Sequence, residues 1–338
     1  MQVKKKISIN DIARELGISI TTVSFILNGR AQEKRISENL VKKVQDFINE
    51  VDYKPNSLAR SLRTGKTNII GLMVEDISDP FFSTIARLIE EKSYQNGYKI
   101  IYCSTENDTA KTRELIKMYS ERHVDGYIIV PPEGIEEDIK TLTASGKPVV
   151  LLDRYLPGIE TDTIVIDNLE SAYHATRHLI DNGYKNIAFV TIDSLQLQMQ
   201  ERLSGYEKAM NEARLPQYVK EIAYNSAQSV PQITAFLHRK KNIDAVFFAT
   251  NYLCVSGLKA ISGMGAKIPQ EIGVVSFDDY ELFEMYSPAI TTVAQPAEQI
   301  AEHAINLLLT RLKKNTAPKK VERIVLSTSF IVRNSSIR

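Results

Sequence analysis

The sequence predicts a small all-α segment at the N-terminus, followed by a large α/β body built on doubly wound parallel sheets. Short helical patterns occupy residues 8–51. After residue 67, short apolar runs alternate with helical segments, the pattern that parallel sheets covered by helices produce. With 338 residues, 43% of them hydrophobic and 25% charged, the chain is long enough for more than one globular domain.

Residues 8–28 predict two short helices joined at a glycine. Ser8 precedes Asp11 by three residues, the spacing of a capping box, in which each side chain binds the other residue's backbone amide. Gly17 suits the left-handed backbone that ends a helix, and Ser19 can cap the next one. This order is typical of a helix-turn-helix, whose second helix can enter the major groove of DNA. A helical hairpin inside a larger all-α domain is the alternative.

A third amphipathic helix is predicted over residues 37–51, with Ser37 as its cap and apolar residues at helical spacing. Pro55 then stops one element and Asn56 can start another, which leaves room for about two turns of helix before Gly65. Because so short a helix is marginal in water, this segment is predicted to become ordered only against a partner. A polar linker with transient helicity is the alternative interpretation.

Charge is divided unevenly along the chain. Residues 1–66 carry 13 Lys+Arg and 7 Asp+Glu, whereas the remaining residues carry 29 and 34, so the net charge of +1 combines a basic head with a mildly acidic body. A basic head is expected where only that part of the protein must neutralise phosphates. A solvated basic surface would have the same composition.

The cysteines and the N-terminus indicate the compartment. Cys103 and Cys254 lie far apart in the sequence without metal-ligand spacing, so they are predicted to be reduced thiols. No apolar segment follows the N-terminal lysines, and no stretch approaches the length needed to cross a bilayer. We therefore expect a cytoplasmic protein.

The body is predicted from its regular alternation of elements. The apolar runs, interpreted as buried strands, are residues 69–74, 100–103, 127–130, 149–152, 187–190, 245–249 and 272–277. The intervening helical segments include residues 81–96, 109–122, 168–183, 200–213, 229–240 and 252–264. Ligands of such sheets bind beyond the carboxyl ends of the strands, so the residues just after each run are candidate ligand contacts.

Those residues are unusually polar. They include Asp76, Asp79, Asp153, Arg154, Thr250, Asn251, Asp278 and Asp279, with Phe81 and Phe82 close by and Arg202 at the start of a helix. Hydrogen-bond acceptors and two guanidinium groups beside aromatic rings would suit a polyhydroxylated ligand. For any single carboxylate, however, capping of a helix N-terminus is the better interpretation.

The usual enzyme motifs are missing or incomplete. Thr64-Gly65-Lys66-Thr67 resembles the end of a phosphate-binding loop, but Arg60 stands where the first glycine is required. The chain contains no Gly-x-Ser-x-Gly elbow, Gly-x-Gly-x-x-Gly fingerprint or His-Glu-x-x-His pair. His174 and His178 have the spacing of two metal ligands, yet no third ligand is evident and a helix surface is their expected place. We expect no enzyme activity, no metal and no cofactor.

Segments spread over nearly the whole chain resemble those of the lactose-repressor (LacI/GalR) family, in the same order. In the head they are residues 9–13, 22–24, 27–29 and 53–62, the last beginning Tyr53-Lys54-Pro55-Asn56-Ser57. In the body they are residues 70–72, 125–126, 150–154, 167–168, 201–206, 291–296 and 332–336, together with Asp79-Pro80-Phe81-Phe82 and Ser276-Phe277-Asp278-Asp279.

The resemblance implies a dimeric bacterial transcription factor, expected to be a repressor, that binds a palindromic operator under the control of a small effector. It divides the chain into a headpiece, residues 1–52, a hinge, residues 53–66, and an effector-binding and dimerisation body, residues 67–338. The body would resemble periplasmic binding proteins, with one lobe of about residues 67–165 and 296–325 and a distal lobe of about 166–295 plus the C-terminal strand. The competing hypothesis is a solute receptor whose head docks a protein.

The resemblance assigns base reading to Ile20, Thr21 and Phe25 of the second helix. Phe25 replaces a basic residue that is often found at this position, and the replacement removes a bidentate guanine contact. Thymine methyl contacts from Ile20 and Phe25 would remain. The resemblance assigns phosphate contacts to Ser19, Thr22, Ser24, Asn28 and Ser37, and Ser8 completes the predicted DNA-binding set of the headpiece.

Two further segments are implied to contact the duplex. Leu62 matches the leucine that paired hinges wedge into the minor groove, and Asn56, Ala59 and Arg63 would flank it. A loop three residues longer than in shorter members, residues 31–36, adds Lys34 and Arg35 near the DNA backbone. These are predicted phosphate contacts, although a solvated loop is nearly as good an interpretation.

For the effector, the resemblance implies contacts from both lobes. Arg202 and Asp278 would hold it from the distal lobe, and Asp79, Phe81 and Asp153 from the other. The expected effector is a sugar or sugar phosphate. Thr250-Asn251 stands where many relatives have Asn-Asp, which slightly weakens the sugar interpretation in favour of a sugar phosphate, a nucleoside or another polar metabolite, because Arg154 and Arg202 would face less negative charge. The full predicted effector set is Asp79, Phe81, Phe82, Asp153, Arg154, Arg202, Thr250, Asn251, Asp278 and Gln295.

Overall fold

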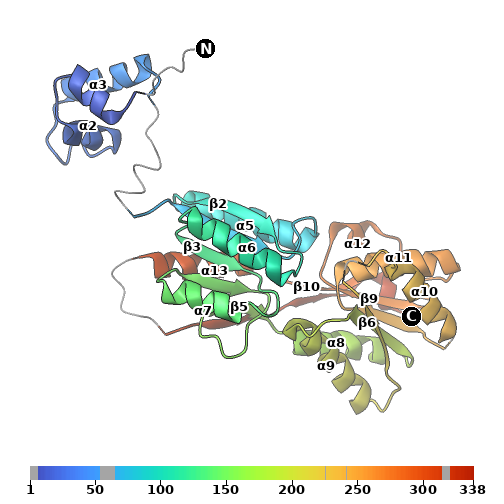
Figure 1. Ribbon diagram of the computed structural model, residues 1–338. Helices are drawn as coiled ribbons and strands as arrows, with labels where there is room; N and C mark the ends of the chain where they lie inside the picture. The colour runs from blue at the N-terminus through green and yellow to red at the C-terminus, as the bar shows by residue number, and fades with distance from the viewer. Residues whose placement is uncertain (1–6, 54–64, 225, 241, 314–319) are drawn as a thin grey trace. The chain divides into compact units, whose positions relative to one another are not determined.

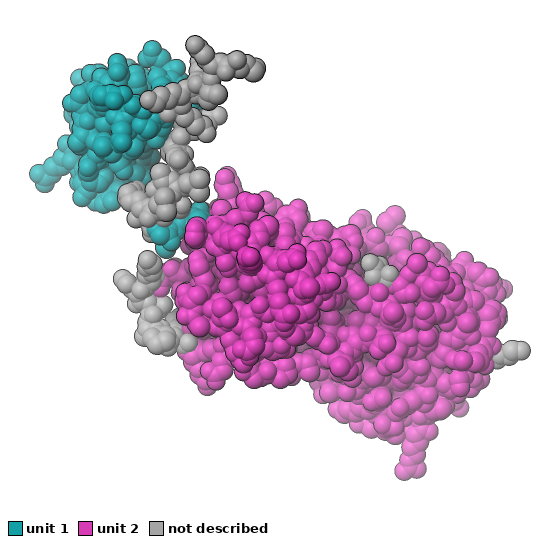
Figure 2. All heavy atoms as spheres, in the orientation of Figure 1, with its two compact units in different colours: residues 1–67 teal, residues 68–338 magenta. Residues whose placement is uncertain are grey.

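The chain forms two compact units, residues 1–67 and residues 68–338 (Figure 2). The computed structural model describes residues 7–53, 65–224, 226–240, 242–313 and 320–338. The predicted hinge contacts Asn56, Ala59, Leu62 and Arg63 lie outside the described residues. Within the described parts of the chain, no helix is both long and apolar enough to cross a membrane.

The described part of the first unit contains three helices, α1 (Ile9–Glu15), α2 (Ile20–Leu27) and α3 (Glu38–Glu50). The predicted capping box is confirmed, since Ser8 Oγ accepts from the Asp11 amide at 3.3 Å and Asp11 Oδ2 accepts from the Ser8 amide at 3.0 Å. Gly17 has the expected left-handed backbone, with φ of 65°. The helix-turn-helix predicted from these residues is therefore present.

A small apolar core joins the three helices. Ile12 and Ala13 of α1, Val23 and Ile26 of α2, and Val44 of α3 form one buried cluster. The small side chain of Ala13 lets α2 cross α1 closely, because a larger group would separate the helix axes. The side of α2 opposite Val23 and Ile26 contributes no buried residue to this cluster.

Two six-stranded sheets form the framework of the second unit (Figure 1). In bonded order, the first sheet contains β11 (Arg323–Leu326), β5 (Asp162–Ile166), β4 (Val149–Leu152), β3 (Gly126–Ile129), β1 (Ile69–Val74) and β2 (Lys99–Ser104). The second contains β12 (Ser329–Ile331), β10 (Thr291–Ala294), β9 (Gly273–Phe277), β8 (Ala245–Phe248), β6 (Ile187–Ile192) and β7 (Tyr218–Ile222). All neighbouring strands are parallel except β10 and β12, so the predicted α/β class is confirmed.

Helices cover the first sheet on both faces. Leu72 of β1 packs in a cluster with α5 (Pro80–Gln95) and α13 (Ala297–Leu312), while the next residue, Met73, packs in a cluster with α6 (Thr109–Glu121) and α7 (Glu136–Ala144). Successive side chains of a strand point to opposite faces, so a strand covered on both sides is apolar throughout. This explains why β1 is a continuous apolar run in the sequence.

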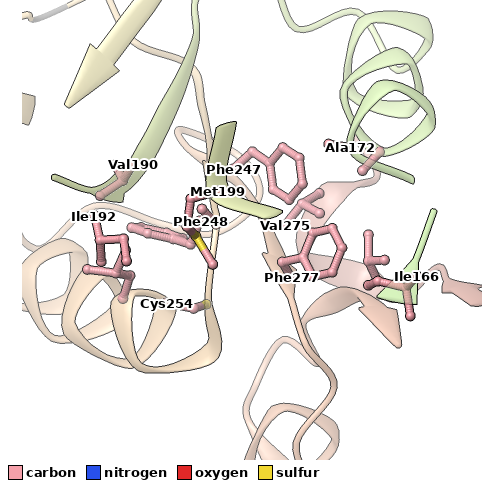
Figure 3. Close-up of a cluster of buried hydrophobic side chains, with 14 of the residues drawn as sticks. Ile166, Ala172, Val190, Ile192, Met199, Phe247, Phe248, Cys254, Val275 and Phe277 are labelled. Carbon is pink, nitrogen blue, oxygen red and sulfur yellow. The ribbon is translucent and has the colours of Figure 1, made fainter. Parts of the chain in front are cut away.

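The second sheet is flanked by two helix pairs, α8 (Asn168–Asp181) with α9 (Leu197–Glu212), and α10 (Ser229–Arg239) with α11 (Asn251–Met264). Figure 3 shows Phe247 and Phe248 of β8 and Phe277 of β9 in the core that these elements share. Gly205 lets α9 lie against α8, because a Cβ there would stand 2.2 Å from the Leu169 carbonyl oxygen. A short helix, α12 (Glu281–Met285), and a 3₁₀ turn, η1 (Asn334–Ser336), complete the described elements.

The chain passes three times between the two sheets. It leaves the first sheet after β5, returns from β10 into α13, and leaves again from β11 into β12. We call the first sheet with α5, α6, α7 and α13 the first lobe, and the second sheet with the remaining helices the second lobe. Residues distant in sequence therefore face each other at the carboxyl ends of the strands.

Candidate functional site

One side of α2 is turned away from the core of the head. Val23 and Ile26 are buried, whereas Ile20 is 48% exposed and Thr21 is also exposed. Phe25, one turn after Thr21, is half-buried. The three predicted base-reading residues thus lie together on the accessible side of α2, and their contacts with bases stay a prediction.

The polar residues that were assigned to phosphate contacts hold the ends of the helices. Ser19 Oγ accepts from the Thr22 amide at 3.0 Å, and Ser37 Oγ accepts from the Leu40 amide at 3.4 Å. At the end of α2, Asn28 Nδ2 donates to the Ser24 carbonyl oxygen at 2.6 Å. Capping serines stand beside the free amides of helix N-termini, where anions are favoured, so the cap and the predicted phosphate contact are compatible.

In the second unit, residues from both lobes border a cleft. The ten predicted effector residues all line one cavity of about 30 Å³. A larger cavity of about 410 Å³ shares Glu75, Asp79, Phe82, Asn251 and Tyr252 with it. Together they provide room for a small organic molecule. The structure brings the predicted set together, and the effector role of its members stays a prediction.

Local backbone geometry aims the carboxylates. Asp153 and Asp278 directly follow β4 and β9 with φ of 68° and 67°, a left-handed conformation that turns the chain sharply at the end of the strand. Asp79 is the N-cap of α5, where its Oδ1 accepts from the Phe81 amide at 2.8 Å. The same oxygen accepts from Asn251 Nδ2 of the second lobe at 3.3 Å.

Arg154 is committed to partners within the first lobe. Its Nη2 donates to Glu75 Oε2 at 2.5 Å, its Nη1 to Asn107 Oδ1 at 3.0 Å, and its Nε to Asp153 Oδ2 at 3.1 Å. The side chain is buried, so these bonds compensate a charge that has lost its water. Arg154 therefore shapes the wall of the cleft more than it offers a free cation to a ligand.

Arg202, within α9, is likewise bound to partners of its own lobe, the second. It is 2% exposed, its Nε donates to Asn168 Oδ1 at 2.9 Å, and its guanidinium carbon lies 3.6 Å from the centroid of the Phe277 ring. Asp278 Oδ2 lies 3.9 Å from Arg202 Nη1, and Asp278 Oδ1 accepts from Gln295 Nε2 at 2.6 Å. The neighbouring Asp279 is bound instead to Arg333 at 2.8 Å.

The surroundings of the carboxylates Asp79 and Asp278 in the cleft disfavour their charged form. Burial, and secondly the charge of Asp278, raise the pKa of Asp79 to about 6. Burial also raises the pKa of Asp278, although Arg202 and Gln295 oppose this. A ligand that donates hydrogen bonds to these oxygens would relieve the penalty.

Sequence reasoning missed part of the lining, notably Glu75, Gln196, Gln198, Tyr224 and Tyr252. Gln198 is 2% exposed and its Nε2 donates to Asp153 Oδ2 at 3.2 Å, while its Oε1 has no hydrogen-bond partner among the described residues. The rings of Tyr224 and Tyr252 meet edge to face, with centroids 6.2 Å apart. Glu75 and Tyr224 follow strands, so the strand-end rule could have found both once β7 was recognised.

Family models match both units. The model described as "Bacterial regulatory proteins, lacI family" matches residues 8–56, and that described as "Periplasmic binding protein-like domain" matches residues 176–336. Among curated proteins, the chain is 31% identical over 333 residues to the HTH-type transcriptional repressor PurR of Vibrio parahaemolyticus, which covers 97% of this chain and 98% of that protein.

Solved structures agree with these matches. The lac repressor dimer bound to operator and the anti-inducer ONPF is similar in fold, with a TM-score of 0.86 and 21% identity over 99% of this chain and all of that one. A LacI family transcriptional regulator from Enterococcus faecium with bound ribose has a TM-score of 0.70 and 28% identity, covering 80% of this chain and 98% of that one.

Proposed function

This chain belongs to the LacI family of bacterial regulatory proteins, and we propose that it represses transcription by binding a palindromic operator as a homodimer whose DNA affinity is set by a small polar effector. The chain is a DNA-binding transcriptional repressor of that family with a ligand-binding body, and the palindromic operator, the homodimer and the control by an effector are what we propose. The family consists of regulators and not of enzymes.

The observation that carries the effector proposal is a buried acceptor in the cleft that lacks a donor, beside two carboxylates whose burial disfavours their charge. Gln198 Oε1 is buried and has no partner among the described residues, and Asp79 and Asp278 are both kept in surroundings that disfavour their charge. An acceptor that has lost water without gaining a donor is destabilising, and a ligand rich in N–H or O–H groups would satisfy it. A core with a purely structural role would gain no stability from a buried acceptor that lacks a donor.

The charges of the cleft support a ligand without a phosphate. Among the described lining residues, five carboxylates face two guanidinium groups, and both arginines are already bound to partners within the chain. The structure therefore gives less support to a sugar phosphate than the sequence did. We propose an uncharged, donor-rich molecule such as a sugar or a nitrogen base, in keeping with relatives named PurR and with a neighbour solved with ribose.

The test pairs a thermal-shift screen with a mobility-shift assay on the full-length protein. D-Ribose is compared with ribose 5-phosphate, and inosine with inosine 5′-phosphate, because a ligand that binds only the folded state raises the melting temperature by mass action. The unphosphorylated member of a pair should raise the melting temperature more, and it should change the fraction of operator duplex that the protein shifts. A phosphorylated member that stabilises more strongly would refute the charge argument.

The competing function, a receptor whose head docks a protein, has its own outcome. It predicts that the full-length protein shifts no duplex, even with operator half-sites arranged as a palindrome. Any duplex shift that the isolated body, residues 68–338, does not reproduce would exclude it.

A further inference from the structure

Helix α2, the recognition helix that is proposed to enter the major groove of DNA, contains no charged residue. Its sequence is Ile-Thr-Thr-Val-Ser-Phe-Ile-Leu, and it has neither an acidic first turn nor a basic last turn. DNA-binding surfaces normally place cations beside the phosphates, which supply most of the affinity. The nearest positive charges of the head must therefore come from outside α2.

The loop after α2 supplies two cations to the side of that helix. The guanidinium carbon of Arg30 lies 5.7 Å from the centroid of the Phe25 ring, and Lys34 Nζ lies 5.5 Å from it. These distances are within the range of cation–π attraction. The loop is closed against the helix by its own backbone, since the Arg30 amide donates to the Phe25 carbonyl at 2.9 Å and the Lys34 amide to the Arg30 carbonyl at 3.1 Å.

Glu33 fixes the directions of both side chains. Its two carboxylate oxygens accept from Arg30 Nη2 at 2.6 Å and Nε at 2.7 Å, and Lys34 Nζ lies 3.4 Å away. Hydrogen bonds from Arg30, and to a smaller extent from Lys34, lower the pKa of Glu33 to about 2, so the carboxylate stays ionised. We call Phe25, Arg30, Glu33 and Lys34 the loop clasp.

The clasp differs from an ordinary surface ion pair. A cation at the C-terminal end of a helix is already favoured by the helix dipole, which would explain one charge near α2. The dipole does not explain why both cations converge on the ring of a residue on the accessible side of the helix. Long exposed side chains lose conformational entropy when they are held in one position. The common position of Arg30 and Lys34 therefore needs their two contacts with the Phe25 ring and the ion pairs with Glu33.

We propose that Arg30 and Lys34 form a phosphate-binding site of the recognition helix, which replaces the charge that Phe25 does not provide. The contact is assigned to phosphate and not to guanine, because Glu33 already occupies the Nε–Nη2 edge of the Arg30 guanidinium, one of its two edges that can bind a base bidentately, and holds Arg30 beside the helix. Lys34 is a point charge that suits the same target. The inference rests on the proposed binding of DNA through α2.

The experiment measures the affinity of the full-length protein for a fluorescent duplex of arbitrary sequence by anisotropy, between 50 and 200 mM salt. The slope of log K against log salt concentration falls in magnitude by about 0.9 for each phosphate contact that is lost. Arg30→Gln with Lys34→Gln should therefore lower the slope by up to about 1.8 for each bound head. Arg30→Lys with Lys34→Arg keeps both charges and should retain most of it.

A matched control is available in the same domain. Arg14 is ion-paired with Asp11, three residues away, at 2.6 Å, the same spacing and distance as the pair of Arg30 with Glu33, but it lies at the end of α1 and not in the loop after α2. Arg14→Gln should leave the slope unchanged.

The outcomes separate this inference from the proposed function. If the wild-type protein binds duplex while the double glutamine variant keeps the wild-type slope, the clasp is a solvated loop and only this inference fails. If the variant loses affinity for one sequence much more than for another, the contact reads bases and the phosphate assignment is overturned. If the wild-type protein binds no duplex, the proposed function fails with it.

Discussion

Asp79 offers a direct test of the electrostatics in the cleft. Its carboxylate is largely buried at the start of α5, where it accepts from the Phe81 amide and from Asn251. Burial and the charge of Asp278 raise its pKa to about 6 from the ordinary 3.8. Asp79→Asn removes the charge and keeps an oxygen that can cap the helix, because asparagine is as good an N-cap as aspartate.

The sign and size of the effect follow from linkage. A pKa that is raised in the folded state means that the folded chain binds more protons than the unfolded chain between about pH 4 and pH 6. The stabilising contribution of the protonated form is thus complete below pH 4 and lost as the pH rises through 6. A shift of about two units corresponds to roughly 3 kcal/mol, an upper value because part of the group still contacts water. Asp79→Asn should therefore stabilise the protein above pH 6 by up to about 3 kcal/mol, and by nothing from this source below pH 4.

Urea unfolding of the full-length protein at pH 4 and pH 7.5 measures this difference. Asp108→Asn is the matched control, since Asp108 caps α6 with a 2.8 Å bond from the Lys111 amide and lies outside the lining of the cleft cavities. Its change in the free energy of unfolding measures the effect of replacing aspartate by asparagine at a helix cap outside the cleft. If Asp79→Asn is no more stable at pH 7.5 than this control leads one to expect, the penalty assigned to the cleft is wrong.

Three other substitutions test other parts of the structure. Gly205→Ala should lower the free energy of unfolding by several kcal/mol in urea, because its Cβ would meet the Leu169 carbonyl oxygen at 2.2 Å; unchanged stability would contradict the close approach of α9 to α8. Arg154→Ala should lower it by about 3–5 kcal/mol, because Glu75 would be left buried without its cation, and Glu75→Gln in the same background should recover part of the loss. Leu62→Ala should weaken binding to an operator far more than to a scrambled duplex in a mobility-shift assay, and equal losses would refute the wedge role.

Local chemistry explains which elements could be predicted. The capping box at Ser8 and the left-handed Gly17 depend only on neighbouring residues, so they define the helix-turn-helix without tertiary information. Strands buried on both faces, such as β1, are continuous apolar runs. By contrast, β7 lies at the edge of its sheet, has one buried residue and contains the consecutive charged residues Lys220 and Glu221. Its sequence therefore resembles a polar segment, and Tyr224 after it is hidden in the same way.

The partners of the cleft residues could not be predicted in the same way. Arg154 lies at the cleft as predicted, but its guanidinium is bound to Asp153, Asn107 and Glu75, and Glu75 is 79 residues away in the chain. That pairing depends on the register in which β1 and β4 flank β3. A sequence pattern can place a charge at the end of a strand, while the neighbouring strand decides whether that charge is free.

The positions of Asp79 and Asp278 bear on how an effector would act. Asp79 belongs to the first lobe because it caps α5, and Asp278 belongs to the second because it follows β9. The charge of Asp278 disfavours the charge of Asp79 when the lobes are together, and the bond from Asn251 to Asp79 is the opposing attraction. A ligand shifts a conformational equilibrium only by its difference in affinity for the two states. A ligand that donates to both carboxylates would have that difference, whereas one held by a single lobe would bind without changing how the lobes close.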